Sequence, residues 1–305
     1  MDCPGILPTT HADCWLITRG VANATPLRHW VFLIATAGCL SASSSAQNAG
    51  EAISAQDLAK KVVDNQIVAS EQDHTHWFYR DRIEKPSGEI DEKAIIETSH
   101  GDIDRLLSIN GKPLDAAQRQ KDEQRIQTQL HDRSRQQKAQ KDQAEDAAKM
   151  EKVMKALPEA LLFSYGPGTK ETIQLLFKPN PAFHPHSREA RVLNALAGSM
   201  WIDAKTNMIQ EISGHLVHEV KFGGGLLGHL DQGGQFHVTL DEVGSGQREM
   251  TRLDVHMKGK ALFFNTISVQ QSEARNDFKR VVDNLTLAQA AEVLAQPSRL
   301  AQVEK

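Results

Sequence analysis

The chain after Pro158 is a succession of short strand-like segments separated by turns, and this feature limits the possible folds more than any other. Apolar and polar residues alternate over 172–177, which is typical of a half-buried strand. Segments 198–203 and 208–212 flank a short turn and predict a hairpin. Further strands are expected at 214–222, 235–243, 250–257 and 262–269. Because the connections are too short for the crossovers that parallel strands need, these segments predict an antiparallel sheet.

The first part of the chain after residue 50 adds a helix and more strands. Ser54 can cap a helix whose apolar residues recur at helical spacing as far as Ile67. Strands are expected from His74 to the turn at Pro86, at 94–98 and at 106–109, which gives a three-stranded meander. At the other end, Thr286 and Gln289 form a plausible capping box for a last helix.

Residues 115–157 differ in composition from the segments on either side. They contain no glycine or proline and are dominated by charged residues, glutamine and alanine, so they predict helix. Between Lys121 and Gln143 the only large apolar residues are Ile126 and Leu130, and we expect this part to be mostly solvated. A coiled-coil partner helix is the alternative interpretation.

The predicted fold class is α+β, a strongly curved antiparallel half-barrel sheet with covering helices and a long charged helical insertion. Large antiparallel sheets curl, so their edges and concave face need cover, and the concave face is a natural place for an apolar cavity. The expected parts are a leader at 1–46, a helix and meander at 47–114, the insertion at 115–157, the main strands of the same half-barrel at 158–285, and a C-terminal helix and tail at 286–305.

An apolar run at 30–40 follows Arg28 and precedes a serine-rich segment that ends at Ala46, which is the pattern of a secretory signal peptide. The run is too short to span a bilayer as a helix. We therefore expect cleavage after Ala46 and a periplasmic or secreted mature protein. All three cysteines lie before that point, so cleavage excludes thiol catalysis and disulfides. The alternative is acylation of Cys39 and a lipid-anchored protein.

The remaining motifs carry little chemistry. With 35 basic and 39 acidic residues the formal charge is −4, which argues against nucleic-acid binding. Segment 244–246 has the features of a hairpin turn and not of a nucleophile elbow, and the glycines at 223–225 lack a phosphate-binding pattern. Among thirteen histidines, a metal site is conceivable at His74, His76, His184 and His186, but exposed strand and loop histidines are the favoured interpretation. No catalytic residue, metal or cofactor is expected.

Residues 198–209 (Gly-Ser-Met-Trp-Ile-Asp-Ala-Lys-Thr-Asn-Met-Ile) resemble the "Trp-Ile-Asp, two residues, Thr" hairpin of the outer-membrane lipoprotein-sorting family, the LolA-like periplasmic carriers. Residues 258–264 suit a later strand pair of that family, and the likeness extends over roughly 52–275. The resemblance implies an unclosed half-barrel with helices over an apolar cavity that takes acyl chains without covalent chemistry. The charged insertion and the glycine-rich loop depart from the family pattern, and no polar functional residue carries over.

The expected function is therefore that of an exported, non-enzymatic protein that binds a lipid or the acyl chain of a lipoprotein. We expect the cavity to be lined by Trp77, Tyr79, Ile173, Leu175, Phe177, Trp201 and Phe236. Leu226 and Leu227 are candidates for a lid or membrane contact at the tip of the glycine-rich loop. The alternatives are a cell-envelope scaffold with a filled cavity, whose charged helix binds a protein partner, and a metal-dependent hydrolase.

Overall fold

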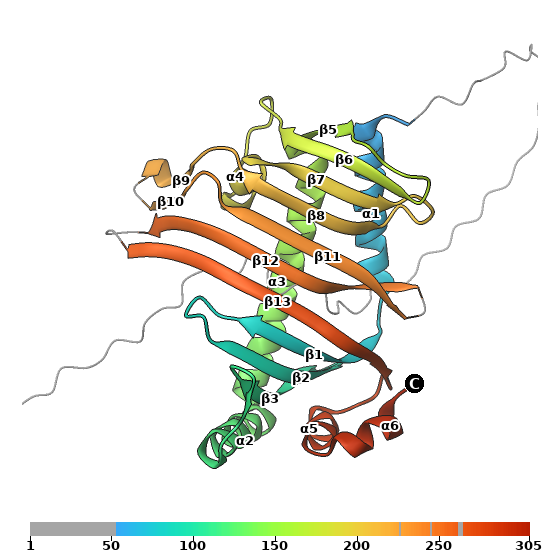
Figure 1. Cartoon of the computed structure of the whole chain (residues 1–305), viewed down its shortest axis with the longest axis vertical. Helices are drawn as coiled ribbons and strands as arrows, with labels where there is room; N and C mark the ends of the chain where they lie inside the picture. Colours follow the sequence, from blue (N-terminus) through green and yellow to red (C-terminus); the bar gives the residue numbers. More distant parts are fainter. Residues whose placement is uncertain (1–52, 226, 245, 262–264) are drawn as a thin grey trace, which may run out of the picture.

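The computed structural model describes residues 53–225, 227–244, 246–261 and 265–305. Within this part the chain forms one open antiparallel sheet of 13 strands and six α-helices, so the expected α+β class with a large antiparallel sheet is confirmed (Figure 1). The strand order is β4-β3-β2-β1-β13-β12-β11-β8-β7-β6-β5, and off this path β10 pairs with β12 and β9 pairs with β10. The expected leader, with Cys39 and the site after Ala46, lies outside the described residues.

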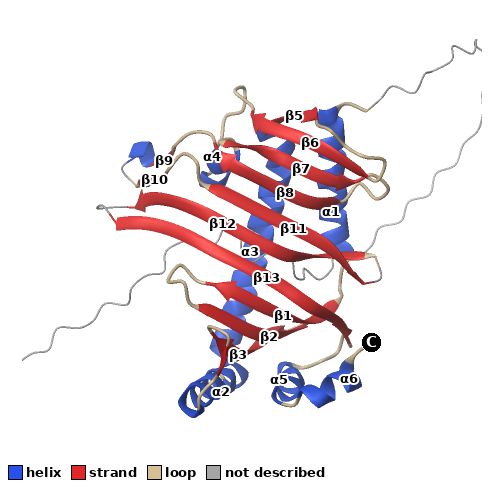
Figure 2. Ribbon diagram, viewed as in Figure 1, coloured by secondary structure: helices blue, strands red, loops and turns tan. Residues whose placement is uncertain are grey.

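Figure 2 separates the strands from the helices, and each element has definite bounds. The strands are β1 His76–Glu84, β2 Ile90–Thr98, β3 Gly101–Ile109, β4 Lys112–Pro113, β5 Leu161–Tyr165, β6 Thr172–Pro179, β7 Leu196–Asp203, β8 Ile209–Leu216, β9 Val220–Phe222, β10 Gly228–Leu230, β11 Gln235–Gly244, β12 Gln247–Ala261 and β13 Asn265–Val281. The helices are α1 Ala55–Gln72, α2 Ala116–His131, α3 Arg133–Ala160, α4 Arg188–Leu193, α5 Leu287–Ala295 and α6 Leu300–Val303, with short 3₁₀ turns at Gly223–Gly225 and Pro297–Arg299. None of the described helices is long and apolar enough to cross a membrane.

Local sequence explains the ends of several elements. The Ser54 side chain accepts a hydrogen bond from the Asp57 amide (3.0 Å) and begins α1, and Thr286 with Gln289 forms a complete capping box at α5. Asn110 and Gly111 both have positive φ, which lets the chain reverse between β3 and β4. These short-range signals were readable from the sequence because each involves residues within a few positions of one another.

The register gives the sheet two distinct faces. Leu175 pairs with Met200, and the same face continues through Leu253 to Glu273 on β13. We call this the covered face, because α1 and α3 lie against it behind the sheet in Figure 1. We call the opposite side, which carries Leu176, the open face. The open face is not exposed everywhere. Over β1–β3 it is packed against α5 and against Ile126 of α2.

The charged segment forms two helices rather than one. Asp132 ends α2 and also caps α3, with its side chain accepting from the Arg135 amide (3.1 Å). Ile126 is only 1% exposed and packs in a core cluster with Phe78 and Ile96, and Asp122 is also buried, whereas most other residues of α2 are exposed or half-buried. The end of α3 packs against α1 and β5.

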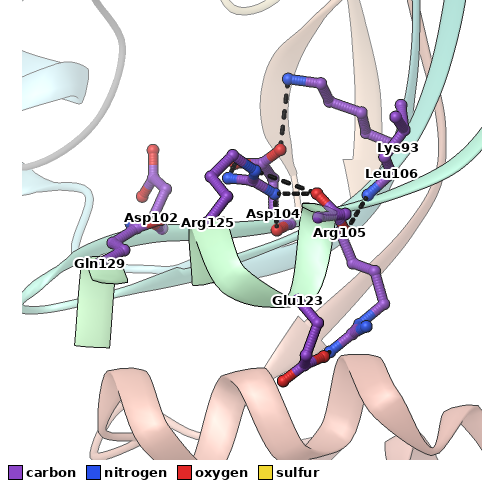
Figure 3. Close-up of polar contacts among 9 residues, drawn as sticks. Lys93, Asp102, Asp104, Arg105, Leu106, Glu123, Arg125 and Gln129 are labelled. Atoms are coloured by element: carbon purple, nitrogen blue, oxygen red, sulfur yellow. Dashed lines mark hydrogen bonds and ion pairs between the residues drawn. The ribbon is translucent and has the colours of Figure 1, made fainter. Parts of the chain in front are cut away.

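Helix α2 covers the free edge of β3 with polar side chains, as Figure 3 shows. Three side chains on one side of α2, those of Asp122, Arg125 and Gln129, hydrogen-bond backbone groups of β3. These are the groups with which an additional strand would pair. The bonds are Leu106 N–H to Asp122 (3.1 Å), Arg125 to the Asp104 carbonyl (2.7 Å) and Gln129 to the Asp102 carbonyl (2.8 Å). An exposed edge strand is a template for association with other chains, so these contacts protect the sheet.

The opposite edge is protected in the same manner by a single side chain of α1. The Gln56 amide accepts a hydrogen bond from the Phe163 N–H (3.1 Å) and donates one to the Leu161 carbonyl (3.2 Å) on β5. A primary amide has the same donor and acceptor as a peptide group, so Gln56 takes the place of a strand residue. Helices therefore cap the exposed edges of β3 and β5 at these positions.

We expect Asp122→Ala to lower the free energy of unfolding by about 1–3 kcal/mol, because it leaves the Leu106 N–H without its acceptor and removes one of the two carboxylates that hold Arg125. Urea unfolding followed by circular dichroism measures this loss. The matched control is Asp142→Ala, which removes an exposed ion pair with Lys138 on α3 and should change stability little. Equal losses in the two variants would contradict the edge-capping role of Asp122.

Candidate functional site

The upper part of the covered face is apolar and closely covered. Leu175, Phe177 and Met200 are at most 4% exposed and belong to one cluster with Leu58 and Val62 of α1. The terminal turns of α3 contribute further apolar side chains to the same cluster. Two strands with alternating residues and two amphipathic helices therefore enclose a continuous apolar layer.

The lower part of the covered face is polar, although it is equally buried. Four carboxyl groups, those of Asp81, Glu97, Glu249 and Glu273, are each less than a tenth exposed. They come from β1, β2, β12 and β13 and share one guanidinium, that of Arg275. Buried charges are rare in proteins unless they are paired, so this arrangement is unusual for a sheet interior.

Arg275 is held by charge and by aromatic rings. Its Nη2 and Nε atoms lie 2.6 and 2.7 Å from Oε1 of Glu273. The guanidinium also lies 5.1 Å from the centre of the Tyr79 ring, which in turn stacks on Phe278 at 5.2 Å. Asp81 is the cross-strand partner of Arg275 in the register. An ion pair and a cation–π contact therefore fix the guanidinium among the carboxyl groups.

Trp77 connects the other two carboxyl groups to the cluster. Its ring N–H donates to Glu249 (3.1 Å) and its backbone N–H donates to Glu97 (3.1 Å). The ring meets Phe278 edge-on with centroids 6.1 Å apart. One residue of β1 thus joins groups that come from β2, β12 and β13.

Burial shifts the acid groups strongly. Burial, and then the negative charge of Glu273, raises the pKa of Asp81 to about 7. Burial, and then the charge of Asp73, raises the pKa of Glu249 to about 7, and burial holds the pKa of Glu97 well above its ordinary value. The negative charge of Glu273 beside Asp81 favours the protonated form of the Asp81 carboxyl group. We therefore expect the cluster to be partly protonated at neutral pH.

The polar and apolar parts of the covered face adjoin each other. Glu273 pairs directly with Leu253, which is fully buried in the apolar cluster. The covered face is therefore amphipathic along the sheet, with hydrogen-bonding groups at one end and apolar side chains at the other. Such a surface can match a molecule with one polar and one apolar end, through hydrogen bonds and burial of apolar area respectively.

The structure divides the predicted cavity residues among different places. Ile173, Leu175, Phe177 and Phe236 contribute to the apolar cluster, and Trp77 and Tyr79 belong to the polar part of the covered face. Trp201 lies on the open face, because its neighbours Met200 and Ile202 are both buried on the covered side. Leu227 is 43% exposed, and Leu226 lies outside the described residues.

The candidate metal histidines do not form a site in the described part of the chain. His76 is buried at the start of β1, where burial lowers its pKa, whereas His74, His184 and His186 are exposed. Across the described residues no group of three or more histidine, cysteine, aspartate or glutamate side chains is arranged to hold a metal ion.

The four buried carboxyl residues and Arg275 were not predicted from the sequence as site residues. Asp81 was visible as a charged residue in a strand, at the same alternation as Trp77 and Tyr79. That pattern indicates a charge on a buried face, which is the one available signal for this site. Glu273 and Arg275 lie in a polar segment of β13 that shows no apolar alternation.

A scan of protein-family models and searches of curated proteins and of solved structures found no match to this chain.

Proposed function

We propose that this chain is an exported, non-enzymatic protein that binds a lipid or the acyl chain of a lipoprotein on the covered face of its sheet. The observation that carries the proposal is the amphipathic covered face, in which buried Leu175 and Leu253 adjoin the cluster around Arg275. An acyl chain would replace contacts between the sheet and its helices, and the polar end of the ligand would meet the carboxyl and guanidinium groups.

The curvature of the sheet and the roles of its covering helices are part of the same proposal. We infer that the sheet acts as a strongly curved half-barrel, that α1 and α3 act as its cover, and that α2 and α3 together are the charged insertion. The open order of the sheet, with β5 and β3 or β4 at its two ends, is compatible with this description. Binding requires the cover to move, since Leu175 and Phe177 are buried beneath α1.

A second function is favoured by the same burial. If α1 and α3 never leave the sheet, the covered face is a filled core and the protein is a scaffold of the cell envelope. In that case the exposed charged side of α3, which carries ion pairs such as Lys138 with Asp142, is the surface offered to a protein partner. The two functions differ in one observable property, which is whether acyl chains enter the covered face.

Two adjacent leucines on β6 provide the test. Leu175 is fully buried on the covered face and Leu176 is 40% exposed on the open face. Leu175→Ala leaves space beside the apolar cluster, so we expect a fluorescent fatty-acid probe to bind it with an affinity several-fold different from that of the natural chain. Leu176→Ala should bind the probe as the natural chain does.

Fluorescence titration of both variants, after circular dichroism has shown that each is folded, measures these affinities. Absence of probe binding to the natural chain would favour the scaffold. An equal effect of the two substitutions would place the bound probe somewhere other than the covered face.

A further inference from the structure

The open face carries a groove that the proposed lipid site does not use. It extends across β6, β7, β8, β11 and β12, has a volume of about 730 Å³ and is widely open to solvent. Figures 1 and 2 show this part of the sheet in front of α1 and α3, which lie behind it. With strands spaced by about 4.8 Å, the five strands give the groove a length of roughly 19 Å.

Two glycines face each other in the strands that form the floor of the groove, and their missing side chains lie on the covered side. Gly198 pairs with Gly214 across β7 and β8. A side chain at Gly198 would collide with the backbone of Ser213, and one at Gly214 would press on Phe236. The glycines therefore allow the aromatic rings of the covered face to lie directly beneath the strands that form the floor.

The lining is rich in hydrogen-bonding groups, and two of its charged side chains, Arg252 and Asp254, form an ion pair. Glu211 lies 3.3 Å from Nε2 of His237, and Asp254 accepts hydrogen bonds from Arg252 (2.5 Å) and from the Ser272 hydroxyl (2.6 Å). The remaining lining is mainly amides, hydroxyls and imidazoles, among them those of Gln174, Ser199, Ser213 and His256. The groove therefore offers both donors and acceptors without a large excess of one charge.

One aromatic side chain borders this lining. Trp201 is partly exposed on the open face, and its cross-strand neighbours, Gln174 and Glu211, both line the groove. Leu176, also in the lining, is 40% exposed. An indole beside polar groups provides an apolar surface together with hydrogen-bond partners.

We propose that this groove binds a neutral oligosaccharide. A sugar chain has hydroxyl groups that both donate and accept, carries no charge, and has C–H faces that pack on an aromatic ring. The hydroxyl groups complement the amides and hydroxyls of the lining, the absence of charge suits a lining without a large excess of one charge, and the C–H faces suit Trp201. The length of the groove accommodates several sugar rings along the row of strands. The proposal is independent of lipid binding, because the groove and the covered face lie on opposite sides of the sheet.

The test uses maltotetraose, cellotetraose and chitotetraose as probes at up to millimolar concentration, with isothermal titration calorimetry on the chain lacking residues 1–46. Trp201 and the buried Trp77 are the only tryptophans in that chain, so tryptophan fluorescence reports on the groove as well. We expect at least one probe to bind. Trp201→Ala should weaken that binding about tenfold through loss of the aromatic contact, and Glu211→Gln should weaken it while conserving shape.

The control is Tyr165→Ala, which removes an exposed aromatic residue from the edge strand β5, outside the groove lining, and should leave sugar binding unchanged. Binding of the fatty-acid probe should be the same in Trp201→Ala and in the natural chain, so failure of one proposal does not imply failure of the other. The proposal is overturned if no probe binds, or if binding persists unchanged in Trp201→Ala. A dimer in sedimentation that Trp201→Ala dissociates would also overturn it, because a second copy would then occupy the groove.

Discussion

Replacing Arg275 by methionine should lower the free energy of unfolding by about 3–5 kcal/mol, because it leaves the buried carboxyl groups of Glu273 and Asp81 without their cation. Methionine fills a similar space, so loss of charge is the main change. Urea unfolding at neutral pH, followed by circular dichroism, measures the effect.

The matched control is Arg252→Met on the neighbouring strand β12. Arg252 also pairs with a carboxylate, that of Asp254, but its side chain is 59% exposed on the open face. Exposed pairs contribute at most about 1 kcal/mol. If both substitutions cost the same, Arg275 does not act as the buried counter-ion of the cluster.

The second large effect is a gain of stability on acidification from pH 8 to pH 5. Asp81 and Glu249 have pKa values of about 7 in the folded chain, well above the ordinary values of 3.8 and 4.5. Between those limits the folded state binds more protons than the unfolded state, so the free energy of unfolding falls as the pH rises. Each group contributes up to about 1.4 kcal/mol per pH unit in that window. His76 opposes the gain below pH 6.5, since burial lowers its pKa.

Glu249→Gln tests the cause of this pH dependence. Glutamine retains an acceptor for the Trp77 ring N–H but never ionises. We expect the variant to be more stable than the natural chain at pH 8, by about 2 kcal/mol, and similar to it at pH 5. Thermal unfolding at the two pH values measures the difference. The control is Glu242, an exposed glutamate on β11. Glu242→Gln should change the unfolding temperature by the same amount at pH 8 and at pH 5.

Local patterns predicted much of the fold. The cap at Ser54, the capping box at Thr286 and the hairpin of β7 and β8 depend on neighbouring residues, and the structure contains all three. The second half of β13 was not predicted. There the covered face itself is polar, with Glu273 and Arg275 buried, so the alternation that marks a half-buried strand disappears.

The candidate site was harder to predict, because its residues meet only through tertiary pairing. Trp77 and Glu249 are hydrogen-bonded but 172 residues apart. Trp201 was expected to line the cavity, whereas the face on which it lies depends on the register with β6 and β8. The charges of α2 were interpreted as solvated, yet Asp122 and Arg125 bind the edge of β3.

The central claim is that acyl chains occupy the covered face. Its most direct test is native mass spectrometry of the chain purified from the periplasm without detergent, followed by solvent extraction and lipid mass spectrometry of the same sample. We expect a population heavier than the polypeptide by the mass of one acyl-bearing molecule, and recovery of that molecule in the extract. The same chain after delipidation and refolding should lack the heavier population and should regain it on addition of the extract. A single mass equal to that of the polypeptide, with no lipid in the extract and none taken up by the refolded chain, would contradict the claim and leave the covered face as a filled core.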